Sequence, residues 1–157
     1  FLGPTWGGKA CPPTYGIGFI AFDKTAGVAL AGSAKVPHST ICKWLPRKNQ
    51  IVMVELLAVM ATIRTLADKL AGKRALFFID SEAVEGAVVK GYSPLSDMGS
   101  LLGRLWQEIV GHKIEAYFDR VPSDANPADA PSKGDNAELA QRGVAWRDLS
   151  VEVAGLG

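Results

Sequence analysis

The sequence predicts an α/β fold in which a mixed β-sheet is flanked by helices. Three observations support this fold class. Two alternating segments joined by a turn are typical of a β-hairpin. A long segment with apolar residues at helical spacing follows them. A short apolar segment, two helical segments and another alternating segment then predict a β-α-β crossover, which adds parallel strands to the antiparallel hairpin.

The first third of the chain predicts a loop and then the hairpin. Residues 1–14 are rich in Gly and Pro and are expected to form a loop. Segments 15–23 and 28–36 alternate small and bulky residues and are expected to be strands joined by a turn at 24–27. Residues 37–48 are polar and are expected to be irregular.

The middle of the chain contains the clearest helix, over 50–70, which Gly72 is expected to end. The apolar segment 74–80 fits a buried strand. The next helix is expected to begin after Ser81, whose hydroxyl can cap it, and to stop at Gly91.

The last third predicts an amphipathic helix over 96–110, with Trp106 in the core, and a strand over 113–118. Residues 124–143 are expected to form a loop followed by one or more short helices, and the sequence leaves the role of 144–157 open.

The composition is that of one globular domain spanning residues 1–157, with 48% apolar and 21% charged residues. No apolar segment approaches the roughly 18 residues of a membrane span. A net charge of +1 does not by itself indicate nucleic-acid binding. Cys11 and Cys42 are too few for a disulfide framework, and we expect free thiols in an intracellular, reducing compartment. The chain starts at Phe1 without a signal-peptide pattern, so we expect a fragment or a processed product.

Three acidic residues occupy unusual positions. Glu55 lies within the apolar pattern of the long helix, Asp80 ends an apolar strand, and Asp129 lies at a loop-to-helix junction. A buried carboxylate is costly unless it pairs or binds a metal, and strand ends are where α/β sheets place their sites. Convergent carboxylates suit Mg²⁺. Each residue also has an ordinary alternative: a solvated helix edge for Glu55, and helix starts for Asp80 and Asp129.

Three motifs in order resemble the reverse-transcriptase-associated ribonuclease H domains of retroelements. Val54–Val59 resembles their ELLA helix, and Phe77–Ala83, followed by Lys90–Gly91, resembles their DN-x-A…KG strand and helix. Val121–Lys133 resembles their terminal S-x-x-N-x-A-D-x-x-S-R motif. The resemblance covers residues 15–134 and leaves 135–157 as a C-terminal extension.

This resemblance implies a five-stranded ribonuclease H fold that cleaves the RNA strand of an RNA–DNA hybrid with two Mg²⁺ or Mn²⁺ ions. It implies that Glu55, Asp80 and Asp129 are catalytic and metal-binding residues. It also implies that Asn126 and Ser132 help to shape the last loop.

The chain departs from the family at its start. The family's first strand is central in the sheet and ends in an aspartate, but the first acidic residue here is Asp23, at the far end of a hairpin strand. We therefore hypothesise that this strand lies upstream or is supplied by another chain. Neither His38 nor His112 matches the histidine that some members carry before the last carboxylate.

A basic segment before the long helix is a candidate nucleic-acid contact. Lys43, Arg47 and Lys48 surround Trp44, so a base or sugar could stack on the indole while the cations hold phosphates. Asn126 is a further candidate contact. The alternative is a solvated loop with a half-buried Trp44. For the whole chain we weigh an active nuclease, a non-catalytic ribonuclease H-like module of a larger assembly, and an unrelated α/β binding domain.

Overall fold

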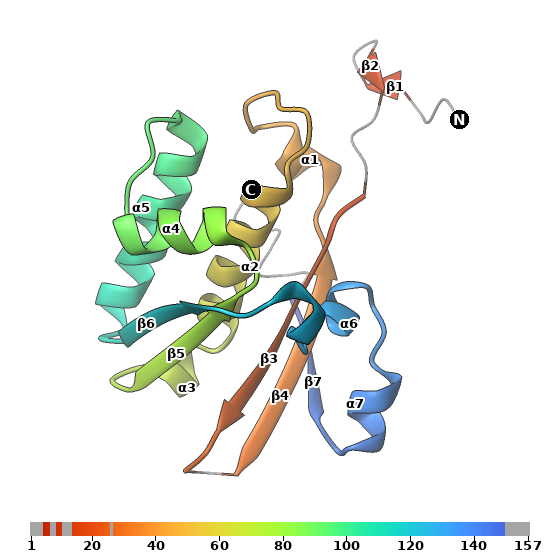
Figure 1. Ribbon diagram of the computed structural model, residues 1–157, viewed down its shortest axis with the longest axis vertical. Helices are drawn as coiled ribbons and strands as arrows, with labels where there is room; N and C mark the ends of the chain where they lie inside the picture. The colour runs from red at the N-terminus through yellow and green to blue at the C-terminus, as the bar shows by residue number, and fades with distance from the viewer. Residues whose placement is uncertain (1–4, 7–8, 11–13, 26, 150–157) are drawn as a thin grey trace.

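The computed structural model describes residues 5–6, 9–10, 14–25 and 27–149 of the 157-residue chain. In this part, the predicted α/β class with flanking helices is confirmed, but the strands form a mixed three-stranded sheet and a separate small parallel sheet instead of one mixed sheet (Figure 1). No helix among these residues has both the length and the apolar character needed to cross a membrane.

The predicted hairpin forms two of the three strands of the mixed sheet, and its second strand lies in the centre. β3 (Gly16–Asp23) and β4 (Val28–Lys35) are antiparallel, and Asp23 pairs with Val28 next to the turn. The Asp23 carboxylate accepts a hydrogen bond of 2.9 Å from the backbone N–H of Thr25, which stabilises this turn.

The C-terminal segment completes this sheet, which the sequence had left open. β7 (Ala145–Asp148) pairs with β4 in parallel. Leu149 is fully buried, and its backbone N–H donates to the carbonyl oxygen of Ser33 at 3.2 Å. The segment up to residue 149 therefore packs on the domain, whereas 150–157 lie outside the described residues.

Among the described residues, the second sheet consists of β5 (Arg74–Ile79) and β6 (Glu115–Arg120), which are parallel and in register. The predicted strand over 113–118 begins two residues too early, because Lys113 has a φ of 54° and belongs to the turn before the strand. Within the described residues, this sheet shares no backbone ladder with β3–β4–β7.

The two helices of the crossover have the predicted ends. In α4 (Glu82–Lys90), the Ser81 hydroxyl accepts the N–H of Val84 at 3.3 Å, and Gly91 adopts the left-handed conformation with φ 68°. α5 (Ser96–Gly111) follows. Both the cap at Ser81 and the stop at Gly91 are confirmed.

The long helix is shorter than predicted. The helix α2 comprises Ile51–Thr65. The next residue, Leu66, has a φ of −102° and a ψ of 12°, which lie outside the helical region, and α3 (Ala67–Leu70) is a separate turn. The prediction of one helix over 50–70 is therefore wrong at this break.

Short elements occupy the segments predicted as loops. α1 (His38–Ile41) forms in the segment predicted as irregular, and β1 (Thr5–Trp6) pairs with β2 (Lys9–Ala10), so the loop prediction is wrong there. The short helices predicted within 124–143 are confirmed as α6 (Asp129–Ser132) and α7 (Ala137–Gln141). The 3-10 helix η1 (Ser123–Ala125) forms at the start of this segment, where a loop was predicted.

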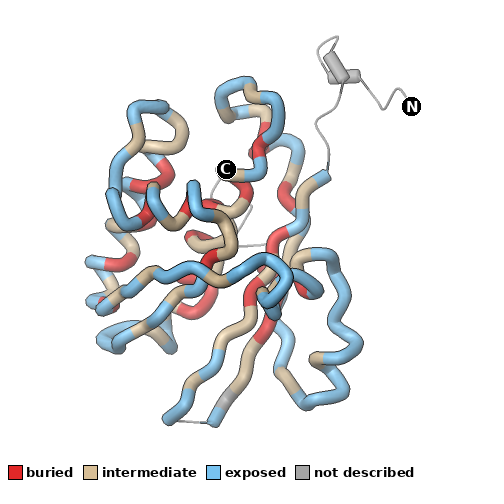
Figure 2. The backbone as a smooth tube through the Cα atoms, in the orientation of Figure 1, coloured by how far each residue is buried: buried red, intermediate tan, exposed pale blue. Residues whose placement is uncertain are grey.

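The core surrounds α2. Figure 2 shows buried residues concentrated on α2 and on the elements that face it. Ile17 and Phe19 of β3 and Ile79 of β5 belong to the same buried cluster as α2. The fully buried large side chains of α2 are Met53, Leu56, Leu57, Met60 and Ile63. Packing on α2 therefore holds the two sheets together.

Trp106 packs against this core, as predicted. Its indole N–H donates to the carbonyl oxygen of Val88 at 3.1 Å, and its ring meets Phe118 edge-on with centroids 6.0 Å apart. The two contacts join α5 to α4 and to β6.

A half-buried ion pair connects the segment before α2 to the start of α5. Both Arg47 guanidinium Nη atoms donate to the Asp97 carboxylate, at 2.6 and 2.7 Å, and the N–H of Leu45 donates to the same carboxylate at 2.9 Å. The side chains of Arg47 and Asp97 are only 19% and 10% exposed. The hydrogen bonds from Arg47 lower the pKa of Asp97 to about 2.

We predict that Asp97→Asn lowers the free energy of unfolding by about 2 kcal/mol at pH 7. Because the pKa of Asp97 in the folded state lies below its usual 3.8, the stabilisation is complete above about pH 4 and is lost as the pH falls toward 2. Urea denaturation at pH 2 to 7 measures this. Glu138→Gln removes an exposed pair with Arg142 and serves as the control, with a loss below about 0.5 kcal/mol. Equal losses for both variants contradict the prediction.

Candidate functional site

Glu55 carries the most unusual carboxylate of the chain. It lies on α2 between the buried residues Val54 and Leu56, and its Oε2 atom is shielded from solvent without a hydrogen bond to the described residues. Burial raises the pKa of Glu55, a hydrogen bond from Ser81 opposes this, and the nearby charge of Asp80 raises it further. The side chain is therefore partly desolvated and lies next to a second acid.

Asp80 is that second acid, and it directly follows the last residue of β5. Its Oδ2 atom accepts a hydrogen bond of 3.1 Å from the Asn126 side-chain amide. The C-terminal end of β5 thus brings together a carboxylate from α2 and one from the strand end.

Asn126 connects this pair to the loop before α6. While its amide nitrogen donates to Asp80, its Oδ1 accepts the N–H of Ala128 at 3.0 Å and its carbonyl oxygen accepts the N–H of Asp129 at 3.2 Å. One side chain therefore shapes the turn that precedes Asp129 and fixes that turn to the end of β5.

Asp129 is not joined to the two other predicted ligands. Its exposed carboxylate forms an ion pair of 2.8 Å with Lys133, one helical turn further along. Ser132 donates its hydroxyl to the carbonyl oxygen of Asp129 at 2.6 Å. Among the described residues, no three His, Cys, Asp or Glu side chains are grouped closely enough to hold a metal ion. The structure brings together Glu55 and Asp80, and it connects Asp129 to them only through Asn126.

Two glycines of β3 allow α6 to lie directly on the sheet. Ile17 and Phe19 point into the core, so the alternate residues Gly16 and Gly18 face the other side of the strand. A Cβ atom at Gly16 would overlap the backbone of Ser132, and one at Gly18 would overlap the backbone of Pro131 and Ser132. The backbone of α6 therefore leaves no room for a side chain at either glycine.

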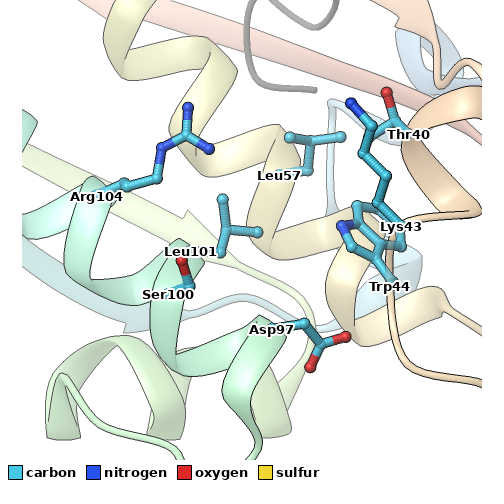
Figure 3. Close-up of a pocket in the computed structure, with 8 residues that line it drawn as sticks. All are labelled: Thr40, Lys43, Trp44, Leu57, Asp97, Ser100, Leu101 and Arg104. Carbon is cyan, nitrogen blue, oxygen red and sulfur yellow. The ribbon is translucent and has the colours of Figure 1, made fainter.

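The predicted nucleic-acid contacts have different surroundings. Arg47 is engaged by Asp97, whereas Lys48 is exposed. Trp44 is half-buried, packs against the core and lines a small hollow together with Lys43 (Figure 3). Cys42 is a free thiol, and Cys11 lies outside the described residues.

Sequence reasoning missed the role of Ser81 toward Glu55 and the partner of Arg47. Ser81 was identified only as a helix cap, although its position next to Asp80 was a signal that it could reach the same site. The pairing of Arg47 with Asp97 joins residues 50 positions apart, and no local pattern indicates it.

Comparison of the chain with protein-family models, curated proteins and solved structures gives no match. The residues of the site are therefore the basis for the functional argument.

We predict that Gly18→Ala destabilises the fold by about 1 to 3 kcal/mol, because the added methyl group overlaps the backbone of α6. Thermal unfolding measures this loss. The matched control is Gly86→Ala on α4, where nothing lies within 4 Å of the added Cβ and the exchange should stabilise the helix by about 0.5 to 1 kcal/mol. A gain in stability for both variants contradicts the close approach of α6 to β3.

We predict that Glu55→Gln stabilises the protein at neutral pH. Because the pKa of Glu55 is raised above its usual 4.5 in the folded state, the wild type loses stability relative to the variant as the pH rises from about 4.5 through the raised pKa. Melting temperatures of both proteins from pH 4 to 8 measure this difference. Glu138→Gln, on the exposed face of α7, is the control and should follow the wild type. A constant offset between wild type and Glu55→Gln contradicts the prediction.

Proposed function

We propose that this chain is a metal-dependent ribonuclease H-type endonuclease domain that cleaves the RNA strand of RNA–DNA hybrids, as part of a retroelement polyprotein. The observation that carries this proposal is the desolvated, unpartnered carboxylate oxygen of Glu55 beside Asp80, at the C-terminal end of β5. Such a position is costly for Glu55 in an ordinary fold, since burial and the nearby charge of Asp80 both disfavour its ionised form.

The donors at this site fit Mg²⁺ or Mn²⁺, because hard cations prefer carboxylate oxygens and Glu55 has an oxygen that no described residue hydrogen-bonds. Glu55 and Asp80 would hold the metal, and Asp129 would join them once it leaves Lys133. When bound, two such ions supply an activated water and stabilise the leaving oxygen of a phosphodiester.

The protein's own groups orient these carboxylates. Asn126 holds Asp80 and the Asp129 turn in one hydrogen-bonded unit, while Ser81 steadies Glu55. Gly16 and Gly18 seat α6 on β3, which limits how far Asp129 can move.

We further propose that the complete fold is the ribonuclease H fold, with one more strand between β3 and β5. Among the described residues, β3 and β5 each pair along one edge only. The ion pair of 3.6 Å between Lys73 and Asp23 brings the end of β3 next to the start of β5. A strand from upstream or from another chain could pair with both edges and add the first aspartate.

In this proposal the hybrid is recognised by its backbone shape and 2′-hydroxyl groups. Lys43, Trp44 and Lys48 precede the helix that carries Glu55, and Asn126 adjoins the carboxylates. Arg47 contributes indirectly, since its bonds to Asp97 fix the segment that holds these residues.

A second candidate is a non-catalytic ribonuclease H-like module that serves as a structural or interaction subunit. The ion pair of Asp129 with Lys133 favours it, because this contact withdraws the third carboxylate from Glu55 and Asp80. The absence of a three-ligand group among the described residues is consistent with it.

We predict Mg²⁺-dependent cleavage of a labelled RNA–DNA hybrid that Asp80→Asn lowers at least 100-fold, since the variant loses a metal ligand. The chain is assayed alone and, where its gene encodes residues before Phe1, with those residues restored. Duplex DNA of the same sequence is the substrate control, and circular dichroism verifies folding. Cleavage only by the extended form indicates that the added strand completes the site. If neither form cleaves the hybrid although both are folded, the proposed nuclease activity is overturned and the second candidate is favoured.

A further inference from the structure

The two faces of the parallel β5–β6 sheet have different surroundings. Alternate residues of a strand point to opposite faces of its sheet. On the inner face, Phe77 and Ile79 pack into the core around α2. On the outer face, which points away from that core, three large apolar side chains are at least half exposed. They are Leu76 at 56%, Phe78 at 59% and Tyr117 at 50%.

These three side chains form one apolar patch, which we call the outer patch. Leu76 pairs with Tyr117 in the ladder, and Phe78 is the next residue of β5 on the same face. The corresponding face of β3 is covered, because α6 lies directly on Gly16 and Gly18. Parallel strands occur almost only in sheets with both faces covered, and large apolar patches on a protein surface usually mark an interaction site. The outer patch therefore indicates a contact with another molecule.

The charges beside the outer patch make it complementary to a second copy of itself. Arg74 and Glu115 form an exposed ion pair of 3.3 Å across the first residues of the two strands. A two-fold axis parallel to the strands would place β5 of one copy over β6 of the other. Each Arg74 then faces the Glu115 of the second copy, and each Leu76 faces the Tyr117 of the second copy. The charges at this end alternate in sign, whereas the exposed Asp119 at the other end stays at the polar rim.

The size of the outer patch fits a weak dimer. A fully buried aromatic side chain covers roughly 150 to 250 Å², so a half-exposed ring has about 100 Å² left to bury. Two rings and one leucine then contribute about 300 Å² from each copy. With the flanking charged side chains, the total approaches the roughly 1,000 Å² that a specific interface needs. We therefore expect a dissociation constant on the order of 10 to 100 µM.

We propose that the outer patch is the contact surface of a symmetric dimer, in which two copies of this chain pack face to face through β5 and β6. The contact uses the outer face of β5 and not its edge, so the strand proposed between β3 and β5 can be present or absent. The dimer also requires neither a metal ion nor nuclease activity.

The first test is sedimentation velocity of the full chain from about 5 to 500 µM. We expect a concentration-dependent shift from monomer to dimer. Leu76→Lys should weaken this association at least tenfold, because it places a charge in the centre of the patch. Since Leu76 is exposed in the single chain, circular dichroism should show an unchanged fold. The matched control is Val110→Lys on α5, which changes an apolar side chain that is 71% exposed and lies outside the patch, and it should dimerise like the wild type.

The second test is charge reversal, which probes how the two copies are oriented. Arg74→Glu alone and Glu115→Arg alone should each associate at least tenfold more weakly than the wild type, because all charges at this end of the contact then have one sign. An equimolar mixture of the two variants should form a heterodimer, since each copy then faces opposite charges across the two-fold axis.

A chain that remains monomeric at about 500 µM overturns the proposal, and so does a dimer that Leu76→Lys leaves intact. A mixture of the two charge variants that does not associate overturns the two-fold arrangement on which the proposal rests. Asp80→Asn should dimerise like the wild type, so failure of the nuclease proposal and failure of this one are distinguishable.

Discussion

The burial of α2 is the constraint on which the rest of the structure depends. The two sheets share no backbone hydrogen bonds among the described residues, so the apolar side chains of α2 must hold them in place. Leu56, Leu57, Met60 and Ile63 are at most 1% exposed. Because several elements pack around this helix, the carboxylate of Glu55 is half-buried, and its Oε2 atom is shielded from solvent. The packing that makes the fold possible therefore also creates the unusual chemistry of Glu55.

Hydrogen bonds to its neighbours keep the unfavourable pair of Glu55 and Asp80 in place. Asp80 would repel Glu55 less if it could turn toward solvent, but the Asn126 amide holds its carboxylate. The same asparagine shapes the turn before α6, and that helix rests on β3 without intervening side chains. Contacts between neighbouring residues thus connect the end of β5, the loop before α6 and the β3–β4 hairpin. Because the core holds these elements in place, the two acids stay next to each other although their charges repel.

Much of the fold could be predicted because its signals are local. The hairpin, the Ser81 cap and the Gly91 stop each depend on a few neighbouring residues, and the structure contains all three. The break of the long helix at Leu66 and the strand formed by 145–148 were not predictable, because distant partners decide them. The Arg147 side chain, for example, donates to the carbonyl oxygen of Thr65 at the end of α2, at 2.8 Å. For the candidate site, the positions of Glu55 and Asp80 followed from apolar patterns, whereas the ion pair of Asp129 depends on side-chain geometry that no pattern encodes.

The parallel pairing of β7 with β4 also has a consequence for the way the chain folds. Leu30 pairs with Ala145, so this ladder joins residues 115 positions apart. To form contacts of such long sequence separation, the chain must first close a large loop, which costs conformational entropy. Such contacts therefore slow folding. The hairpin and α2 can form early, because their contacts join residues that are close in sequence. In contrast, β7 can pair with β4 only after residues 145–148 have left the ribosome. During synthesis, the outer edge of β4 is consequently exposed for longer than any contact inside the hairpin, and it is then open to pairing with other chains.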